Sequence, residues 1–159
     1  SWATILSKRT NYAKAFANWD IAKIAAFDDA KFEQLMQDAG IVRNKLKIAA
    51  TIANAKGALA VQKEFGSLAT FLWGLVPNAP IVNQFASRDQ MVSQTELSAT
   101  MSKQLKARGF RFVGPTTVYS FMQAVGMVVD HTTDCFCHPN NVKKRTAADA
   151  AQPPPKKKK

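Results

Sequence analysis

Both cysteines and both histidines of the 159-residue chain lie within residues 130–139, DHTTDCFCHP. Thiolate sulfur and imidazole nitrogen are ligands that zinc prefers in proteins, so this segment predicts a metal site. Four ligands so close in the sequence would strain a tetrahedral geometry around one ion. Two interpretations therefore stay open: the segment supplies half of a zinc site, or its thiols and imidazoles bind no metal.

A second segment, residues 103–124, has the pattern helix, glycine, short turn, glycine, helix. Gly109 and Gly114 bracket the turn, and Pro115 or Thr116 begins the next helix, a position where proline loses no hydrogen bond. Free N–H groups in a first helical turn bind anions such as a DNA phosphate. The basic side chains around this turn are Lys103, Lys106, Arg108 and Arg111. The same pattern also occurs between packed helices that bind no ligand, so both interpretations stay open.

The elements that position these segments are predicted to be helices almost throughout, because apolar residues recur at helical spacing. The predicted ranges are 1–8, 11–19, 21–27, 29–40, 45–65, 68–76, 95–108 and 116–129. The predicted helix-starting caps are Thr10 or Asn11, Asp20, Asp28, Asn44 and Ser67. Gly40 fits a left-handed C-terminal cap, and residues 77–96 read as an irregular loop. The fold class predicted from this pattern is all-α.

Composition predicts a single basic globular domain. The chain has 47% hydrophobic and 21% charged residues, and its formal net charge is +11. Residues 143–159 contain seven Lys or Arg and one Asp, a net charge of +6, which leaves +5 for the body. This balance favours a polyanionic partner, nucleic acid before an anionic membrane, and no stretch is long and apolar enough to span a membrane. Two neighbouring cysteines without a disulfide framework favour a reducing compartment.

Five stretches of the chain together resemble the 3-methyladenine DNA glycosylase I family. They are SWATILSKRTNYAKAF, DAGIVRNKLKI, EFGSLATFLW, RGFRFVGPTTVYSFMQAVGMVVDH and CFCHP. The resemblance implies a helix-hairpin-helix DNA glycosylase domain over 1–139 that lacks the family's N-terminal segment. The change of composition after Pro139, to Lys, Ala, Gln and Pro, predicts a disordered basic tail over 140–159. It also implies that a monomer flips out and hydrolytically removes 3-methyladenine from alkylated double-stranded DNA. The expected location is the cytoplasm, at the nucleoid, or the nucleus of a eukaryote.

The resemblance gives the cysteine and histidine segment a specific role. Members of the family hold a structural zinc with two cysteines and two histidines, and here His131 and Cys135 match the C-terminal pair. The other two ligands belong to the segment that this chain is expected to lack. Cys137 and His138 lie within reach of the same turn and are candidate substitutes.

The resemblance also assigns base-binding and phosphate-binding residues. Trp2 matches the tryptophan that stacks on the base, although a tryptophan next to apolar neighbours is equally typical of a core. Tyr119 and Ser120, on the helix after the turn, are expected to border the base pocket. The residues expected to bind DNA phosphate are Gly109, Arg111, Gly114, Thr116 and Thr117.

The catalytic residue is not assigned, because the family's recognition glutamate and pocket tyrosine precede the first residue of this chain. Asp130 has two interpretations. The wider superfamily places a catalytic Asp near this position, whereas this family works without it and a carboxylate beside a zinc-binding histidine commonly orients that histidine. At the level of function the alternative to a glycosylase is a non-catalytic DNA-binding module.

Overall fold

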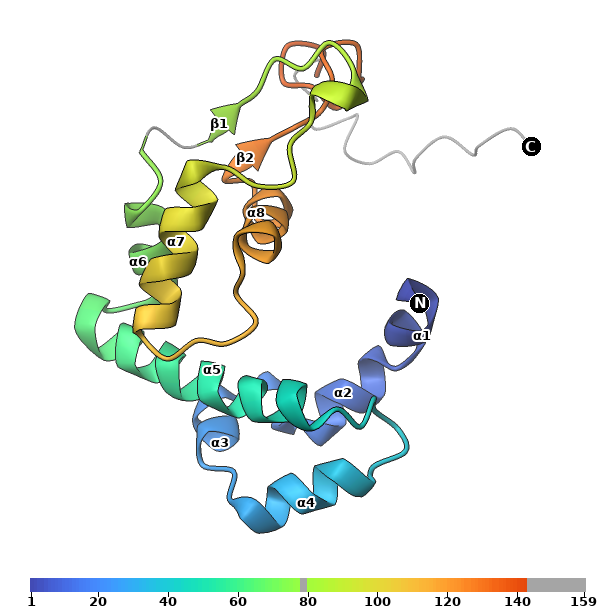
Figure 1. Ribbon diagram of the computed structural model, residues 1–159, viewed down its shortest axis with the longest axis vertical. Coiled ribbons are helices and arrows are strands. Elements are labelled where there is room, and N and C mark those ends of the chain that lie inside the picture. Colours follow the sequence, from blue (N-terminus) through green and yellow to red (C-terminus); the bar gives the residue numbers. More distant parts are fainter. Residues whose placement is uncertain (78–79, 143–159) are drawn as a thin grey trace, which may run out of the picture.

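The computed structural model describes residues 1–77 and 80–142, and the regular secondary structure of this part of the chain is almost entirely helical (Figure 1). Strands β1 (Ile81–Val82) and β2 (Val128–Val129) pair in parallel there. The predicted all-α class is therefore confirmed, with one two-residue ladder added. None of the helices described is long and apolar enough to cross a membrane. Most of the predicted tail, residues 143–159, lies outside the described residues.

The helices form two groups that share one long helix. The first group consists of α1 (Trp2–Ser7), α2 (Arg9–Ala15), the 3-10 helix η1 (Ala17–Trp19), α3 (Ile21–Ala25) and α4 (Asp29–Gln37). The second consists of α6 (Leu68–Gly74), the 3-10 helix η2 (Arg88–Gln90), α7 (Glu96–Ala107) and α8 (Pro115–Ala124). Helix α5 (Lys45–Phe65) runs past both groups, as Figure 1 shows.

Each group has its own hydrophobic core, and α5 contributes to both. The N-terminal core consists of Ala15, Phe16, Ile24, Leu35, Ile41, Ile48 and Ala55. The C-terminal core consists of Val61, Phe71, Leu72, Val76, Met101, Leu105, Val118, Tyr119, Met122, Met127 and Val128. Since the first turns of α5 face one core and its last turns face the other, this helix sets the relative position of the two halves.

Helix starts follow the predicted polar caps at most positions. The side chains of Asp20, Asp28, Asn44 and Ser67 each accept from the N–H three residues on, at 2.8–3.1 Å. The predicted cap at Thr10 or Asn11 is wrong, because α2 already begins at Arg9. The predicted left-handed cap at Gly40 is also wrong: α4 ends at Gln37, and the Asp38 carboxylate accepts from the Gly40 N–H at 2.7 Å.

The last helix is shorter than predicted. It ends at Ala124 because Gly126, with φ of +79°, reverses the chain, and the Met127 N–H donates to the Met122 carbonyl at 2.8 Å. The following Val128–Val129 pair is extended and lies beside β1 instead of continuing the helix. This turn places Asp130 and His131 at the end of a strand, next to the loop that follows β1.

Candidate DNA and base site

Residues 108–114, here called the hairpin segment, join α7 to α8 and are fixed from two sides. Asn54 on α5 donates from Nδ2 to the Arg111 carbonyl at 3.1 Å and accepts at Oδ1 from the Arg111 N–H at 2.7 Å. On the other side the buried Ser102 on α7 donates to the Val113 carbonyl at 2.6 Å. These bonds hold the backbone of the turn in one conformation, so its outward face is preorganised for a ligand.

Gly57 allows the hairpin segment to lie against α5. A Cβ at this position would stand 2.8 Å from Cε2 of Phe110 and 3.0 Å from the Arg108 carbonyl oxygen, closer than real contacts allow. Neither Asn54 nor Gly57 is among the residues predicted from the sequence to form a site. The sequence could have indicated a contact at these positions. Asparagine and glycine are poor helix formers, and here they stand three residues apart on one face of a long predicted helix.

The N-terminus of α8 is open to solvent beside the hairpin segment. Gly114 is its N-cap and Pro115, one of the two predicted starts, its first residue, and no side chain of the described residues caps it. Thr116 and Thr117 are exposed, and the first intrahelical bond is donated only by the Val118 N–H. The N–H groups of these two threonines are therefore the free donors of a helix N-terminus, where the helix dipole favours an anion.

The basic residues near this terminus divide into two kinds. Lys103, Lys106 and Arg111 are exposed. Arg108 instead lies over the rings of Phe65 and Phe71, at 5.2 and 4.6 Å from their centroids. It also forms a 3.2 Å ion pair with Glu64. The expectation that Arg108 adds free charge beside the turn is therefore wrong, since this guanidinium packs the hairpin segment onto α5 and α6.

Trp2 lies on a separate aromatic surface at the N-terminal end of the chain. Its side chain is 92% exposed, so it is not a core residue. It borders a cavity of about 460 Å³ lined by Trp2, Ile5, Leu6, Arg9, Tyr12 and Trp19. Trp19 stacks on the buried Phe16 with a centroid distance of 5.9 Å and an interplanar angle of 1°. Residues 17–19 reach this arrangement with φ between 51° and 65°, a left-handed backbone that non-glycine residues rarely adopt.

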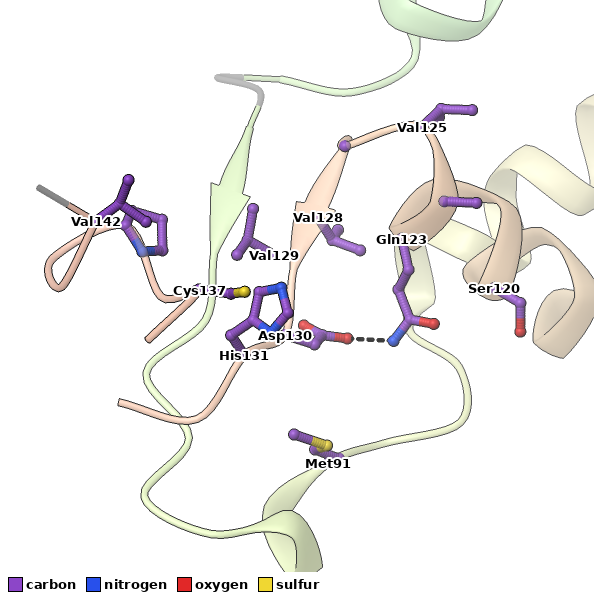
Figure 2. A pocket seen from close by; sticks show the side chains of 13 residues that line it. Met91, Ser120, Gln123, Val125, Val128, Val129, Asp130, His131, Cys137 and Val142 are labelled. Carbon is purple, nitrogen blue, oxygen red and sulfur yellow. Dashed lines mark hydrogen bonds between the residues drawn. The ribbon is translucent and has the colours of Figure 1, made fainter. Parts of the chain in front are cut away.

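A second, larger cavity lies between α8, β2 and the C-terminal turns (Figure 2). Its volume is about 1190 Å³, and its polar lining includes Ser120, Gln123, Asp130, His131 and Cys137. Ser120, which was expected to border the base pocket, is exposed and lines this cavity. Trp2 does not line it. The structure therefore brings Ser120, Asp130 and His131 to one cavity and Trp2 to another.

Asp130 is held by two amide side chains in this cavity. One carboxylate oxygen accepts from Asn83 Nδ2 and the other from Gln123 Nε2, both at 2.7 Å, and Figure 2 shows the second of these bonds. Both oxygens thus have a fixed donor. The bonds tie the residue after β2 to the residue after β1 and to α8, so they fix the position of the carboxylate.

Tyr119 is 1% exposed and belongs to the C-terminal core, so its ring is not available on the surface. Its hydroxyl is buried and forms no hydrogen bond with the part of the chain that the structure describes. Burial, and after it the nearby Asp130 carboxylate, raises the pKa of Tyr119 above its ordinary value. The side chain is neutral at physiological pH, and its hydroxyl lies near Asp130 and Asn83.

The predicted metal ligands are also brought together. The Nδ1 atom of His131 lies 3.6 Å from the Sγ atom of Cys135. Cys137 joins them, since one ligand atom from each of the three residues lies within 4.8 Å of the other two. His138 is fully buried and stands outside this group.

Known proteins match this chain along most of its length. The sequence model of the methyladenine glycosylase family matches residues 1–138. DNA-3-methyladenine glycosylase 1 of Escherichia coli (strain K12) is 43% identical over 141 residues, which cover 89% of this chain and 75% of that protein. DNA-3-methyladenine glycosylase of Haemophilus influenzae is 42% identical over 137 residues, which cover 86% and 74%.

Solved structures agree with the sequence comparison. A crystal structure of 3-methyladenine DNA glycosylase I is 47% identical and superposes with a TM-score of 0.81 over 87% of this chain and 76% of that one. Another, a variant of such a glycosylase in complex with 3-methyladenine, is 34% identical with the same TM-score over 87% and 75%. Sequence and fold lead to one conclusion: the chain belongs to the methyladenine glycosylase family.

Proposed function

We propose that this chain removes 3-methyladenine from alkylated double-stranded DNA. The observation that carries the proposal is the match of residues 1–138 to the methyladenine glycosylase family, with curated relatives above 40% identity. A relative whose structure contains 3-methyladenine has the same fold as this chain. The substrate class is therefore taken from the relatives, and the residues of this chain define how it would be bound.

The departing base does not need to be protonated by an acid. Methylation at N3 makes the adenine cationic, so the glycosidic electron pair leaves with the base and neutralises it. Water attacks C1′, the C1′–N9 bond breaks, and one proton passes to the solvent. The protein has to extrude the nucleotide and hold its base. The exposed face of Trp2, beside Trp19 and Tyr12, suits this task because an aromatic face attracts a cation.

The hairpin segment and α8 would hold the DNA backbone as a helix-hairpin-helix motif. A phosphate at the start of α8 would accept from the N–H groups of Thr116 and Thr117, with Arg111 exposed beside it. Gly109 has a different part, since its φ of +84° lets the chain turn out of α7. Contacts of this kind carry no sequence information, which suits an enzyme that has to find damage anywhere.

Gly114→Ala will weaken duplex binding without weakening the fold. Its φ of −63° suits any residue, and a Cβ there would meet no described atom within 4 Å. The added methyl group would instead occupy the space through which a phosphate approaches. We expect a roughly tenfold higher Kd for duplex DNA, about 1.4 kcal/mol, with Tm unchanged. Gly109→Ala is the contrasting variant. Gly109 has a left-handed backbone that alanine adopts only with strain, so this substitution should lower Tm.

We also propose that His131 and Cys135 hold a structural zinc ion. Tetrahedral zinc with Zn–S of about 2.3 Å and Zn–N of about 2.0–2.1 Å separates a sulfur from a nitrogen ligand by about 3.6 Å. The observed separation of Nδ1 and Sγ is 3.6 Å, so this pair fits the ion. Zinc bound here would cross-link the turns that follow β2 and stabilise them. Asp130, one residue before His131, would keep its positioning role.

The decisive experiment measures release of 3-methyladenine from methylated duplex DNA by the purified 159-residue chain. Free base is quantified by chromatography, and binding to undamaged duplex is measured in parallel at several salt concentrations. We expect base release together with binding that weakens as salt rises. Salt-dependent binding with no release above the protein-free rate would overturn the glycosylase proposal and leave a DNA-binding module.

A further inference from the structure

We infer that Cys137 is a third ligand of the metal held by His131 and Cys135. This inference rests on the zinc proposal above and extends it with a residue that the family resemblance does not assign. The three ligand atoms lie within 4.8 Å of one another, and one edge already has the tetrahedral length. Two thiolates on one zinc stand about 3.8 Å apart, so a shift of Cys137 by about 1 Å at most completes the group.

The backbone holds these ligands close together without using their side chains. The Cys135 N–H donates to the Thr132 carbonyl at 2.8 Å, and the His138 N–H donates to the Cys135 carbonyl at 2.9 Å. These bonds form two successive turns, one before Cys135 and one around Cys137. Both cysteine side chains are thereby placed beside His131, and in Figure 2 the His131 ring and the Cys137 sulfur lie next to each other.

Two further contacts brace the turns from outside. Asn141 donates from Nδ2 to the carbonyls of Thr133 and Cys135, at 2.7 and 3.0 Å. The Thr133 N–H donates to the carbonyl of Phe85 at 2.8 Å, which anchors the segment to the loop after β1. A site whose backbone is fixed before the ion arrives loses little conformational entropy on binding.

The donor set suits zinc in charge as well as in geometry. Two thiolates neutralise the ion, and a neutral imidazole supplies the third bond; sulfur and nitrogen are the ligand atoms that zinc takes in proteins. Cys135 and Cys137 are both partly accessible and neither is in a disulfide. Three side chains leave one tetrahedral position for a water molecule or one further ligand.

Thiol protection tests this assignment directly. The metal-free chain, kept reduced, is alkylated with iodoacetamide with and without one equivalent of zinc, and each cysteine is read by peptide mass spectrometry. We expect zinc to protect Cys135 and Cys137 equally. Protection of Cys135 alone would overturn the third ligand but keep the zinc pair. Protection of neither would overturn both, while the base-release assay still judges the glycosylase proposal.

Cobalt(II) gives a second readout with a matched control. Each thiolate adds to the charge-transfer absorption, so Cys137→Ser should lower the band per bound cobalt by about half and weaken zinc binding at least roughly tenfold. Phe136→Ser is the control, because Phe136 lies between the two cysteines, is 83% exposed and offers no ligand. A Cys137→Ser band and affinity equal to those of Phe136→Ser would contradict the inference.

Discussion

Replacing Trp2 with alanine will lower kcat/KM for 3-methyladenine release by about 5- to 150-fold. Base stacking on an aromatic side chain contributes about 1–3 kcal/mol, and 1.4 kcal/mol corresponds to a tenfold change in rate. The cationic base adds attraction to the indole face that a neutral base lacks. Because Trp2 is 92% exposed, its removal gives up almost no buried area, and Tm should stay the same.

Two comparisons make this prediction specific. Trp73→Ala removes another partly exposed tryptophan, on α6 and away from the aromatic cavity, and should leave base release unchanged. Trp2→Phe should lie between the wild type and Trp2→Ala, since phenylalanine keeps a smaller aromatic face. Base release by Trp2→Ala at the wild-type rate would show that the base is bound elsewhere, with the cavity at Ser120 as the next candidate.

Replacing Asp130 with alanine will lower the free energy of unfolding by about 2–4 kcal/mol, because two hydrogen bonds to a carboxylate are lost at once. For a domain of this size Tm should fall by about 5–15 °C. A single substitution removes both hydrogen bonds, since the Asn83 and Gln123 amides donate to the same carboxylate. Thermal unfolding followed by circular dichroism measures this directly.

The same variant separates a positioning role from catalysis. Loss of a general base typically costs 10²–10⁴-fold in rate, whereas a positioning residue should cost less than about tenfold at temperatures well below the variant's Tm. Asp134→Ala is the matched control, because this exposed carboxylate in the neighbouring turn forms no hydrogen bond or ion pair among the described residues. An unchanged Tm with a thousandfold slower release would instead make Asp130 catalytic.

The local features of the fold were predictable from the sequence, because they depend on neighbouring residues. Four helices begin with a side chain that accepts a hydrogen bond from the N–H three residues further on, so the sequence alone shows the pattern. These caps are Asp20, Asp28, Asn44 and Ser67. The start of α8 at Pro115 was one of two predicted positions, because the fixed φ of proline suits a first helical residue. The end of α8 was not predicted, because Gly126 inside an apolar run reads equally as helix until its φ is known.

The features that the sequence analysis missed depend on contacts between distant segments. Asn54 meets Arg111 across 57 residues, and Arg108 stacks on aromatic rings from two other helices. Tyr119 lies on α8 as expected, yet the way α8 packs points its ring into the core and leaves Ser120 exposed. Spacing within the sequence gives the helix but not the angle at which it packs.

Helix α5 has a consequence for how the hairpin segment is held relative to the N-terminal half. It packs against α3 and α4 at one end and fixes Arg111 through Asn54 further along. Asn54 stands six residues after Ile48, which faces the N-terminal core, so about 9 Å of rigid helix joins that core to the hairpin segment. One residue inserted between Ile48 and Asn54 would lengthen this span by about 1.5 Å and rotate its far end by about 100°, which would turn Asn54 away from Arg111.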